Sequence, residues 1–188
     1  RGVAPHAYLV GGAVDAGSDP DFRSGMYSIQ GQSSILAAEA VEAKPGMRIL
    51  DACAAPGGKS AYLCEKMQMT GRVFAWELHE RRAQLLDGVK RRLSLDNLRV
   101  TVRDASDFRE DLENTLDAVL LDAPCSGTGV MAEKPDIKHR LKEEDIAAIA
   151  ETQKKILNTV CRYVKVGGTL VYSTCAILPE ENRMQVEA

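Results

Sequence analysis

From residue 47 onward the chain alternates short apolar runs with longer stretches of helical periodicity, and this alternation limits the folds open to it. The apolar runs have the length of buried strands, and turn residues separate several of them from the helical patterns. The expected strands cover residues 47–52, 72–77, 98–103, 116–122 and 168–174, and the expected helices cover 59–69, 79–93 and 143–164. Strands that alternate with helices form βαβ units with right-handed crossovers. The predicted fold class is therefore α/β, a doubly wound and mostly parallel sheet.

The first thirty residues lack this regularity, and we expect them to form an irregular lead-in with one short strand at residues 7–10. A helix is expected at residues 33–43, before the breaker at Lys44 and Pro45. The chain thus divides into a lead-in, residues 1–30, and one domain, residues 31–188. Because the chain begins without Met and stops soon after a helix starts, we expect a piece of a longer protein, truncated at both ends.

Composition sets the class of protein. The 188 residues suffice for one domain with a full core, and no apolar stretch approaches the roughly 20 residues that cross a bilayer. The net charge of -3 argues against a uniformly basic nucleic-acid-binding protein. Five cysteines, without Cys-x-x-Cys spacing, indicate free thiols rather than disulfides or zinc ligands. We therefore expect a soluble cytoplasmic protein, a monomer that uses no metal and does not contact a membrane.

The residues that end the expected strands indicate a binding site. Four of the five strands end in a carboxylate, at Asp51, Glu77, Asp104 and Asp122. Ligands of open α/β sheets bind outside the carboxyl ends of the strands. Glu77 is placed to accept both ribose hydroxyls of an adenosine, and Asp104 could accept its adenine amino group. A single Asp after a strand is more often a turn or cap residue, but several in succession favour a site.

Residues 51–60 (DACAAPGGKS) form a Gly-rich turn that admits two interpretations. Its last three residues match the end of a phosphate-binding loop, and Asp122 resembles the acidic residue that holds magnesium in an NTPase. However, Cys53 replaces the first glycine of that motif, so the backbone cannot wrap around phosphates. The alternative is a loop that admits an adenosine cofactor without phosphates, whose carboxylate faces the helix N-terminus. This description fits S-adenosylmethionine, and the incomplete phosphate loop favours it.

Two cysteines, Cys125 and Cys175, follow the fourth and fifth expected strands. Thiols at the active edge of such a sheet indicate covalent catalysis rather than packing. The cysteines at positions 64 and 161 fall on helix faces instead, and we expect both to be small buried hydrophobes.

Basic residues form two clusters. The cluster within residues 81–103 is expected to be the solvated face of a helix. The second cluster follows Cys125 closely, and its members Lys134, Lys138 and Arg140 are candidates for binding the phosphates of an RNA substrate.

Taken together, these residues resemble the RNA 5-methylcytosine methyltransferases, and most closely the bacterial small-subunit ribosomal-RNA methyltransferase B type. The shared segments span most of the chain and are YSIQ (27–30), LDACAAPGGK (50–59), LDAPCSGTG (121–129), KPDIK (134–138), STC (173–175) and LPEEN (178–182). The loop and both cysteine motifs are highly specific, and KPDIK and LPEEN favour the B type. Two departures stand out. Glu77 occupies a position where Asp is common. We also expect these residues to include neither the N-terminal RNA-binding module nor the closing strands that members of this type usually carry.

The resemblance implies a Rossmann-like S-adenosylmethionine-dependent methyltransferase fold that methylates C5 of a cytosine in RNA. The cofactor site that it implies consists of Cys53, Ala54, Ala55, Pro56, Gly57, Gly58, Lys59, Glu77, Asp104 and Asp122. It makes Cys175 the nucleophile and Cys125 the thiol that helps to release the product. Small-subunit (16S) rRNA is the expected substrate. The alternatives are the same chemistry on another RNA such as tRNA, a phosphate-loop NTPase, and an RNA-binding protein of this fold without catalysis.

The chemistry of cytosine explains why a thiol is needed. C5 is a poor nucleophile, and a thiolate that adds to C6 makes C5 able to attack a methyl sulfonium. We assign this thiolate to Cys175 and expect residues 179–181 to begin a helix whose N-terminus helps to stabilise it. Asp122, supported by Lys59, is expected to hydrogen-bond N3 or the amino group of the base. Because C6 is reached only from a face of the base, the cytosine must be unpaired or flipped out.

Overall fold

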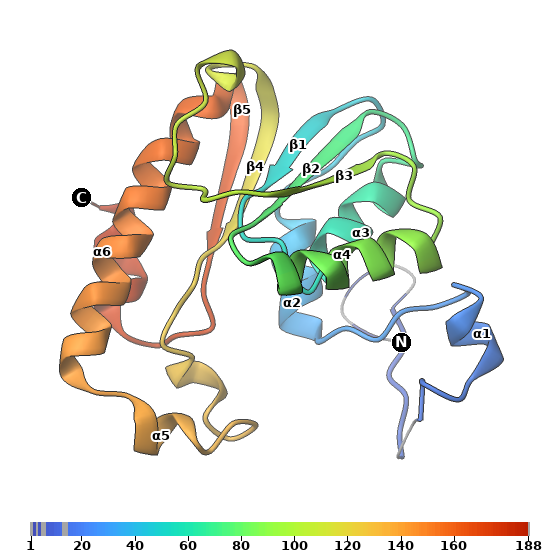
Figure 1. The fold of residues 1–188 in the computed structure, drawn as a ribbon, viewed down its shortest axis with the longest axis horizontal. Helices are drawn as coiled ribbons and strands as arrows, with labels where there is room; N and C mark the ends of the chain where they lie inside the picture. Colours follow the sequence, from blue (N-terminus) through green and yellow to red (C-terminus); the bar gives the residue numbers. More distant parts are fainter. Residues whose placement is uncertain (1, 3, 5–6, 13–14, 188) are drawn as a thin grey trace.

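The computed structural model describes residues 2, 4, 7–12 and 15–187, and its fold is shown in Figure 1. Five strands form one parallel sheet in the order β3-β2-β1-β4-β5. The strands are β1 (Arg48–Asp51), β2 (Arg72–Glu77), β3 (Leu98–Val102), β4 (Leu116–Asp122) and β5 (Val164–Ser173). The predicted doubly wound α/β fold is confirmed. The strand order reverses between β1 and β4, which is where ligands of such sheets bind.

Helices cover both faces of the sheet: α2, α3 and α4 lie on one side and α6 lies on the other (Figure 1). The helices are α1 (Pro20–Arg23), α2 (Gln32–Glu39), α3 (Gly58–Lys66), α4 (Glu80–Arg92), α5 (Ile137–Arg140), α6 (Glu143–Val160) and α7 (Arg183–Val186). Single 3₁₀ turns are η1 (Glu110–Leu112), η2 (Thr128–Val130), η3 (Cys161–Tyr163) and η4 (Pro179–Glu181). Burial on both faces explains why the strands are continuous apolar runs rather than alternating ones.

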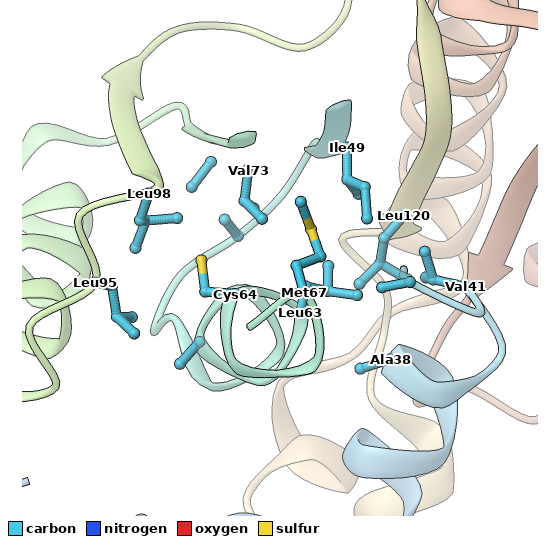
Figure 2. Close-up of a cluster of buried hydrophobic side chains, with 14 of the residues drawn as sticks. Ala38, Val41, Ile49, Leu63, Cys64, Met67, Val73, Leu95, Leu98 and Leu120 are labelled. Atoms are coloured by element: carbon cyan, nitrogen blue, oxygen red, sulfur yellow. The ribbon is translucent and has the colours of Figure 1, made fainter. Parts of the chain in front are cut away.

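The core beneath α3 anchors the first strands. Figure 2 shows Cys64 of α3 and Met67, just after the end of α3, pointing toward side chains of the sheet, among them Ile49 and Val73. All four side chains are fully buried. Burying a large apolar side chain stabilises the fold by roughly 1.5–3 kcal/mol, so this cluster holds α3 firmly against the sheet. The expectation that Cys64 is a small buried hydrophobe is confirmed.

The opposite face packs against α6 and the turn that follows it. Trp76 of β2 meets Tyr163 edge to face, with ring centroids 5.8 Å apart, and Ile156 of α6 joins the same buried cluster. Within the described ranges, no helix is long and apolar enough to cross a membrane, and no three His, Cys, Asp or Glu side chains are grouped as metal ligands.

The predicted helix over residues 143–164 is too long. Helix α6 ends at Val160, a 3₁₀ turn follows, and β5 already begins at Val164 rather than at residue 168. The carbonyls of Arg162 and Tyr163 accept hydrogen bonds from the backbone N–H groups of residues 114 and 115, just before β4. Pairing with the sheet therefore takes the chain out of the helix. The expectation that Cys161 is buried is wrong for the same reason, because this turn leaves its side chain exposed.

The lead-in also differs from its prediction. Residues 7–10 form no strand, and the side chains of Tyr8, Leu9 and Val10 are exposed. Apolar residues alone do not make a strand without a neighbour to pair with. Farther along, Arg92 of α4 donates hydrogen bonds to the carbonyls of Phe22 (2.9 Å) and Tyr27 (3.0 Å). This arginine belongs to the cluster that was predicted to be solvated, and it instead ties the lead-in to α4.

Two helices end earlier than predicted. Helix α2 stops at Glu39 rather than at residue 43, and α3 stops at Lys66 rather than at residue 69. In each case the residues just beyond the helix include a left-handed backbone conformation, at Glu42 (φ 52°) and at Gln68 (φ 52°). The chain turns there to enter the next strand.

Candidate active site

Asp51 and Asp122 end the two strands that flank the point where the strand order reverses. Asp51 is completely buried. Its Oδ2 accepts a hydrogen bond from the Ser60 hydroxyl at 2.6 Å, whereas Oδ1 has no hydrogen-bond partner among the described residues. Burial raises the pKa of Asp51 to about 6. A buried carboxylate with an unpaired oxygen marks this strand end as a place for a polar ligand.

The Gly-rich turn between β1 and α3 is held by backbone contacts. The N–H of Ala54 donates to the Trp76 carbonyl at 2.9 Å, and Arg82 donates to the Ala55 carbonyl at 3.1 Å. Gly57 has a φ of 111°, and a Cβ there would lie 2.9 Å from a methyl group of Leu86. Only glycine suits both the conformation and the space at this position of the turn.

This turn borders a cavity of about 430 Å³, the cofactor cavity. The predicted cofactor residues in its lining are Cys53, Ala54, Ala55, Pro56, Gly58, Lys59 and Asp122. Asp51, one of the predicted strand-end carboxylates, also lines the cavity. So do Gln30, Ser28 and Arg92, whose side chains were not predicted as site residues. The YSIQ segment (27–30) could have indicated Ser28 and Gln30, but it was used only as evidence of the family resemblance. A Cβ on Gly58 would lie 3.3 Å from the Gln30 side chain, so this segment packs closely on the loop.

Glu77 and Asp104 do not line the cofactor cavity. Glu77 is buried, and its Oε1 accepts the backbone N–H of His79 at 3.0 Å. Asp104 Oδ1 accepts both the N–H (2.8 Å) and the hydroxyl (2.7 Å) of Ser106. Both carboxylates therefore make local turn contacts, which were considered as the alternative to a binding role. Their role toward a cofactor stays a prediction.

Cys53 is a lining group rather than a nucleophile. Burial, together with the charges of Asp51, Glu77 and Asp122, raises the pKa of its thiol to about 12. The thiol therefore keeps its proton at neutral pH, and the thiolate is the form that attacks carbon.

Lys59 and Asp122 are brought together as predicted. Lys59 Nζ donates to Asp122 Oδ2 at 2.7 Å, and the Ser173 hydroxyl donates to Oδ1 at 2.7 Å. This ion pair joins α3, at the cofactor cavity, to the ends of β4 and β5. The pair thus places an ammonium group and a carboxylate at the end of β4.

The two predicted reactive thiols lie together. Cys125 Sγ and Cys175 Sγ are 3.1 Å apart, well beyond the roughly 2.05 Å of a disulfide, and both are free. The backbone N–H of Gly129 donates to the Cys175 carbonyl at 2.9 Å, and a Cβ on Gly129 would lie 2.8 Å from that oxygen. Burial, reinforced by the neighbouring thiol, raises the pKa of Cys125 to about 12, whereas Cys175 is exposed.

A second cavity, of about 480 Å³, lies beside Cys125 and is bordered mainly by α5 and α6. Arg140 lines it and pairs with Asp136 at 2.9 Å. Lys134 and Lys138 are exposed and do not line it. Of the three predicted RNA-binding residues, the structure thus places one beside the thiol pair.

The expected helix at residues 179–181 is wrong. These residues form one 3₁₀ turn, and the next helix, α7, has only four residues. So short an element cannot supply the helix-terminal stabilisation that was expected for a thiolate. The same segment instead contains two residues that sequence reasoning missed, Glu181 and Asn182, which bond the loops of both cysteines. The LPEEN motif was their signal, but it gave no hint of what they contact.

Comparisons with known proteins show which family this chain is similar to. The model of the 16S rRNA methyltransferase RsmB/F family matches residues 38–188. The probable ribosomal RNA small subunit methyltransferase B of Bacillus subtilis is 44% identical over 168 residues, covering 89% of this chain and 38% of that protein. The human 28S rRNA (cytosine(4447)-C(5))-methyltransferase is 38% identical over 179 residues, covering 93% of this chain and 22% of that protein.

Solved structures share the fold. NSun6 from Pyrococcus horikoshii, whose crystal structure contains SFG, superposes with a TM-score of 0.80 at 29% identity, covering 90% of this chain and 43% of that one. SFG is an analogue of S-adenosylmethionine. The chain spans 38% of the length of the Bacillus relative, and the family match includes the Gly-rich turn and both cysteine motifs. The chain belongs to the 16S rRNA methyltransferase RsmB/F family, which is a family of S-adenosylmethionine-dependent methyltransferases.

Proposed function

We propose that this chain carries the catalytic centre of an RNA methyltransferase that methylates C5 of a cytosine. The observation that carries the proposal is the pair of free thiols 3.1 Å apart, in the loops that directly follow β4 and β5. Asp122, the last residue of β4, lines the cofactor cavity and pairs there with Lys59. A phosphate-loop NTPase has no use for two adjacent thiols, and an RNA-binding protein without catalysis needs neither the thiols nor the cavity.

The residues present fit S-adenosylmethionine. The cofactor cavity, of about 430 Å³, has the size of a small-molecule site, and the buried Asp51 in its lining offers an unpaired oxygen. Asp51 and the Gly-rich turn would hold the amino-acid end. Glu77 is proposed for the ribose, and Asp104 for the adenine, because its two local bonds go to Oδ1 and leave Oδ2. When bound, the cofactor supplies a methyl group on a positively charged sulfur.

Cys175 is the proposed nucleophile. Its Sγ forms a bond to C6 of the cytosine, and the electron pair of the C5–C6 double bond moves toward C5 while Asp122 and Lys59 hold a proton at N3. C5 can then take the methyl group. Because the raised pKa keeps Cys125 protonated, its S–H can donate to the Cys175 thiolate across 3.1 Å.

Release of the product requires two bonds to break. The proton on C5 leaves through water held beside Cys125, the C5–C6 double bond re-forms, and the Sγ–C6 bond breaks to return the Cys175 thiolate. Without Cys125, the last step should stall and leave the RNA attached to the protein.

The substrate is proposed to be bacterial small-subunit rRNA. The Bacillus relative at 44% identity carries that function in its name, whereas the human relative acts on 28S rRNA. A flipped-out cytosine would reach the thiols, and Arg140, with Lys134 and Lys138 farther out, would bind the flanking phosphates. Transfer of labelled methyl groups to unmodified small-subunit rRNA, large-subunit rRNA and tRNA separates these substrates.

The thiol roles are tested with the complete natural protein, labelled RNA and S-adenosylmethionine. Cys175→Ala should give neither methylated RNA nor an adduct, and Cys125→Ala should accumulate a covalent protein–RNA adduct that migrates slowly on a denaturing gel. Cys161→Ala, which removes an exposed thiol in a distant turn, is the control and should behave like the natural protein. Methylation by Cys175→Ala would sink the nucleophile assignment. Binding of ATP in place of S-adenosylmethionine would support the NTPase instead.

A further inference from the structure

We propose that Glu181 and Asn182 are positioning residues that set the distance between the two thiols, an inference whose kinetic consequence rests on the proposed function. Among the described residues, neither Glu181 nor Asn182 is hydrogen-bonded to a thiol. Glu181 instead bonds the residue after Cys125, and Asn182 bonds the residues on either side of Cys175, so the dipeptide acts on both loops from one place in the chain. We call these two residues the clamp.

Glu181 holds the loop of Cys125. Its Oε1 accepts the backbone N–H of Ser126 at 2.7 Å, and its Oε2 accepts the Ser126 hydroxyl. Gln153 of α6 completes the contact: its side-chain amide donates to the Pro124 carbonyl at 2.8 Å and to Glu181 Oε1 at 3.2 Å. The residues immediately before and after Cys125 are therefore tied to one buried carboxylate and its amide partner.

Asn182 holds the loop of Cys175 in the same manner. Its Oδ1 accepts the Thr174 hydroxyl at 2.8 Å, and its Nδ2 donates to the carbonyls of Ala176 and Leu178, each at 2.9 Å. The residues on both sides of Cys175 are thus bonded to a single side chain. Because Glu181 and Asn182 are consecutive, a shift of either loop relative to the other must strain the clamp.

The burial of Glu181 argues that the clamp has a purpose beyond filling space. Its side chain is completely buried, and a buried carboxylate costs several kcal/mol unless it is fully hydrogen-bonded. An apolar residue would fill the same volume without that cost but could not bond the Ser126 N–H. The contact also spans 55 positions of sequence, so it fixes tertiary geometry rather than a local turn.

The test measures thiol geometry without activity. Diamide oxidises two adjacent thiols to a disulfide and takes up both hydrogens as it becomes a hydrazine. In the complete natural protein, Glu181→Ala should slow formation of the Cys125–Cys175 disulfide by about fivefold or more, since a loosened loop lowers the effective concentration of its thiol. Glu181→Gln should restore most of the rate, because the amide oxygen still accepts the Ser126 N–H. Glu180→Ala, on the exposed neighbour, is the matched control.

A second readout separates loosening from unfolding. Alkylation by iodoacetamide should speed up at Cys125 in Glu181→Ala and at Cys175 in Asn182→Ala, while the fully buried Cys64 stays protected. If methylation is detected, kcat should fall about 10- to 100-fold in Glu181→Ala with the Kd for S-adenosylmethionine unchanged.

Three outcomes are decisive. Equal rates of disulfide formation in Glu181→Ala and Glu180→Ala overturn the inference. Loss of Cys64 protection in both Glu181→Ala and Asn182→Ala, at every temperature at which the natural protein is folded, also overturns it. If the natural protein methylates no RNA but the thiol rates change as described, the proposed function fails while the positioning role stands.

Discussion

Two regions along the edge of the sheet are built in different ways. We call the residues at the ends of β1, β2 and β3, with Asp51, Glu77 and Asp104, the carboxylate end. We call the loops after β4 and β5, with Cys125 and Cys175, the thiol end. The carboxylates of Glu77 and Asp104 bond residues two positions farther along, and Asp51 bonds Ser60, nine positions away. The thiols lie 50 positions apart, and the bonds that hold their loops span up to 55 positions. One region is shaped mostly by its own sequence, the other by packing of distant segments.

The difference is also one of reactivity. At the carboxylate end, burial and negative charge keep the Cys53 thiol protonated, so the region can bind a ligand but offers no nucleophile. At the thiol end, an exposed cysteine lies against a half-buried one. The molecule thus keeps its proposed binding and bond-forming groups in separate regions, joined by the Lys59–Asp122 ion pair.

The largest expected effect comes from breaking that junction. Lys59→Met removes the cation that pairs with Asp122 and should lower kcat for RNA methylation by about 10²- to 10⁴-fold, the usual contribution of a group that holds a proton at the reacting base. Lys66→Met is the control, since Lys66 lies on the same helix and pairs with Glu39 at the surface. Steady-state rates at saturating RNA and cofactor decide the matter. Equal rates in both variants would show that the two regions need no such bridge.

A smaller effect is expected at the carboxylate end. Because burial raises the pKa of Asp51 from 3.8 to about 6, the folded state binds more protons than the unfolded state between these values. The free energy of unfolding should therefore fall as pH rises from 3.8 to 6 and level off above, a loss of about 3 kcal/mol at most. Asp51→Asn should lack this fall. Urea unfolding from pH 4 to pH 7 measures it, with Asp107→Asn, at an exposed position, as the control. Parallel curves for natural protein and Asp51→Asn would contradict it.

The smallest effect is expected at the rim of the thiol end. Arg140→Ala should weaken RNA binding only a few-fold and reduce the slope of log Kd against log salt by about 1, because one phosphate contact is lost. Stability should change by less than about 1 kcal/mol, since the Arg140–Asp136 pair is exposed. Arg162→Ala, which breaks an exposed pair with Glu113, is the control and should leave the slope unchanged. An unchanged slope in Arg140→Ala would remove this residue from the RNA surface.

Sequence reasoning succeeded where the signal was local and repeated. The five strands, the Gly-rich turn and the residues after β4 and β5 follow from apolar runs, glycine spacing and strand-end residues. It failed at the ends of elements. The helical pattern of α6 continues past Val160 in the sequence, but the helix ends there because the carbonyls of Arg162 and Tyr163 bond the backbone just before β4. The sequence of that stretch contains no pattern that indicates these distant partners.

The clamp illustrates the other limit. Glu181 looks in sequence like one of two acidic residues after a proline, yet Glu180 is exposed and Glu181 is completely buried. The 3₁₀ turn and two hydrogen-bond partners, Ser126 and Gln153, determine that Glu181 rather than Glu180 points into the interior. Composition and spacing treat both residues alike.

For this protein, the amino-acid sequence by itself determined which segments become strands and helices and which chemical groups stand at the strand ends, because these depend on neighbours along the chain. Only the tertiary structure decided that the thiols meet at 3.1 Å, that Lys59 reaches Asp122, and that Glu181 is buried where it bonds Ser126. Those outcomes depend on strand order and register, which bring together residues 50 to 63 positions apart.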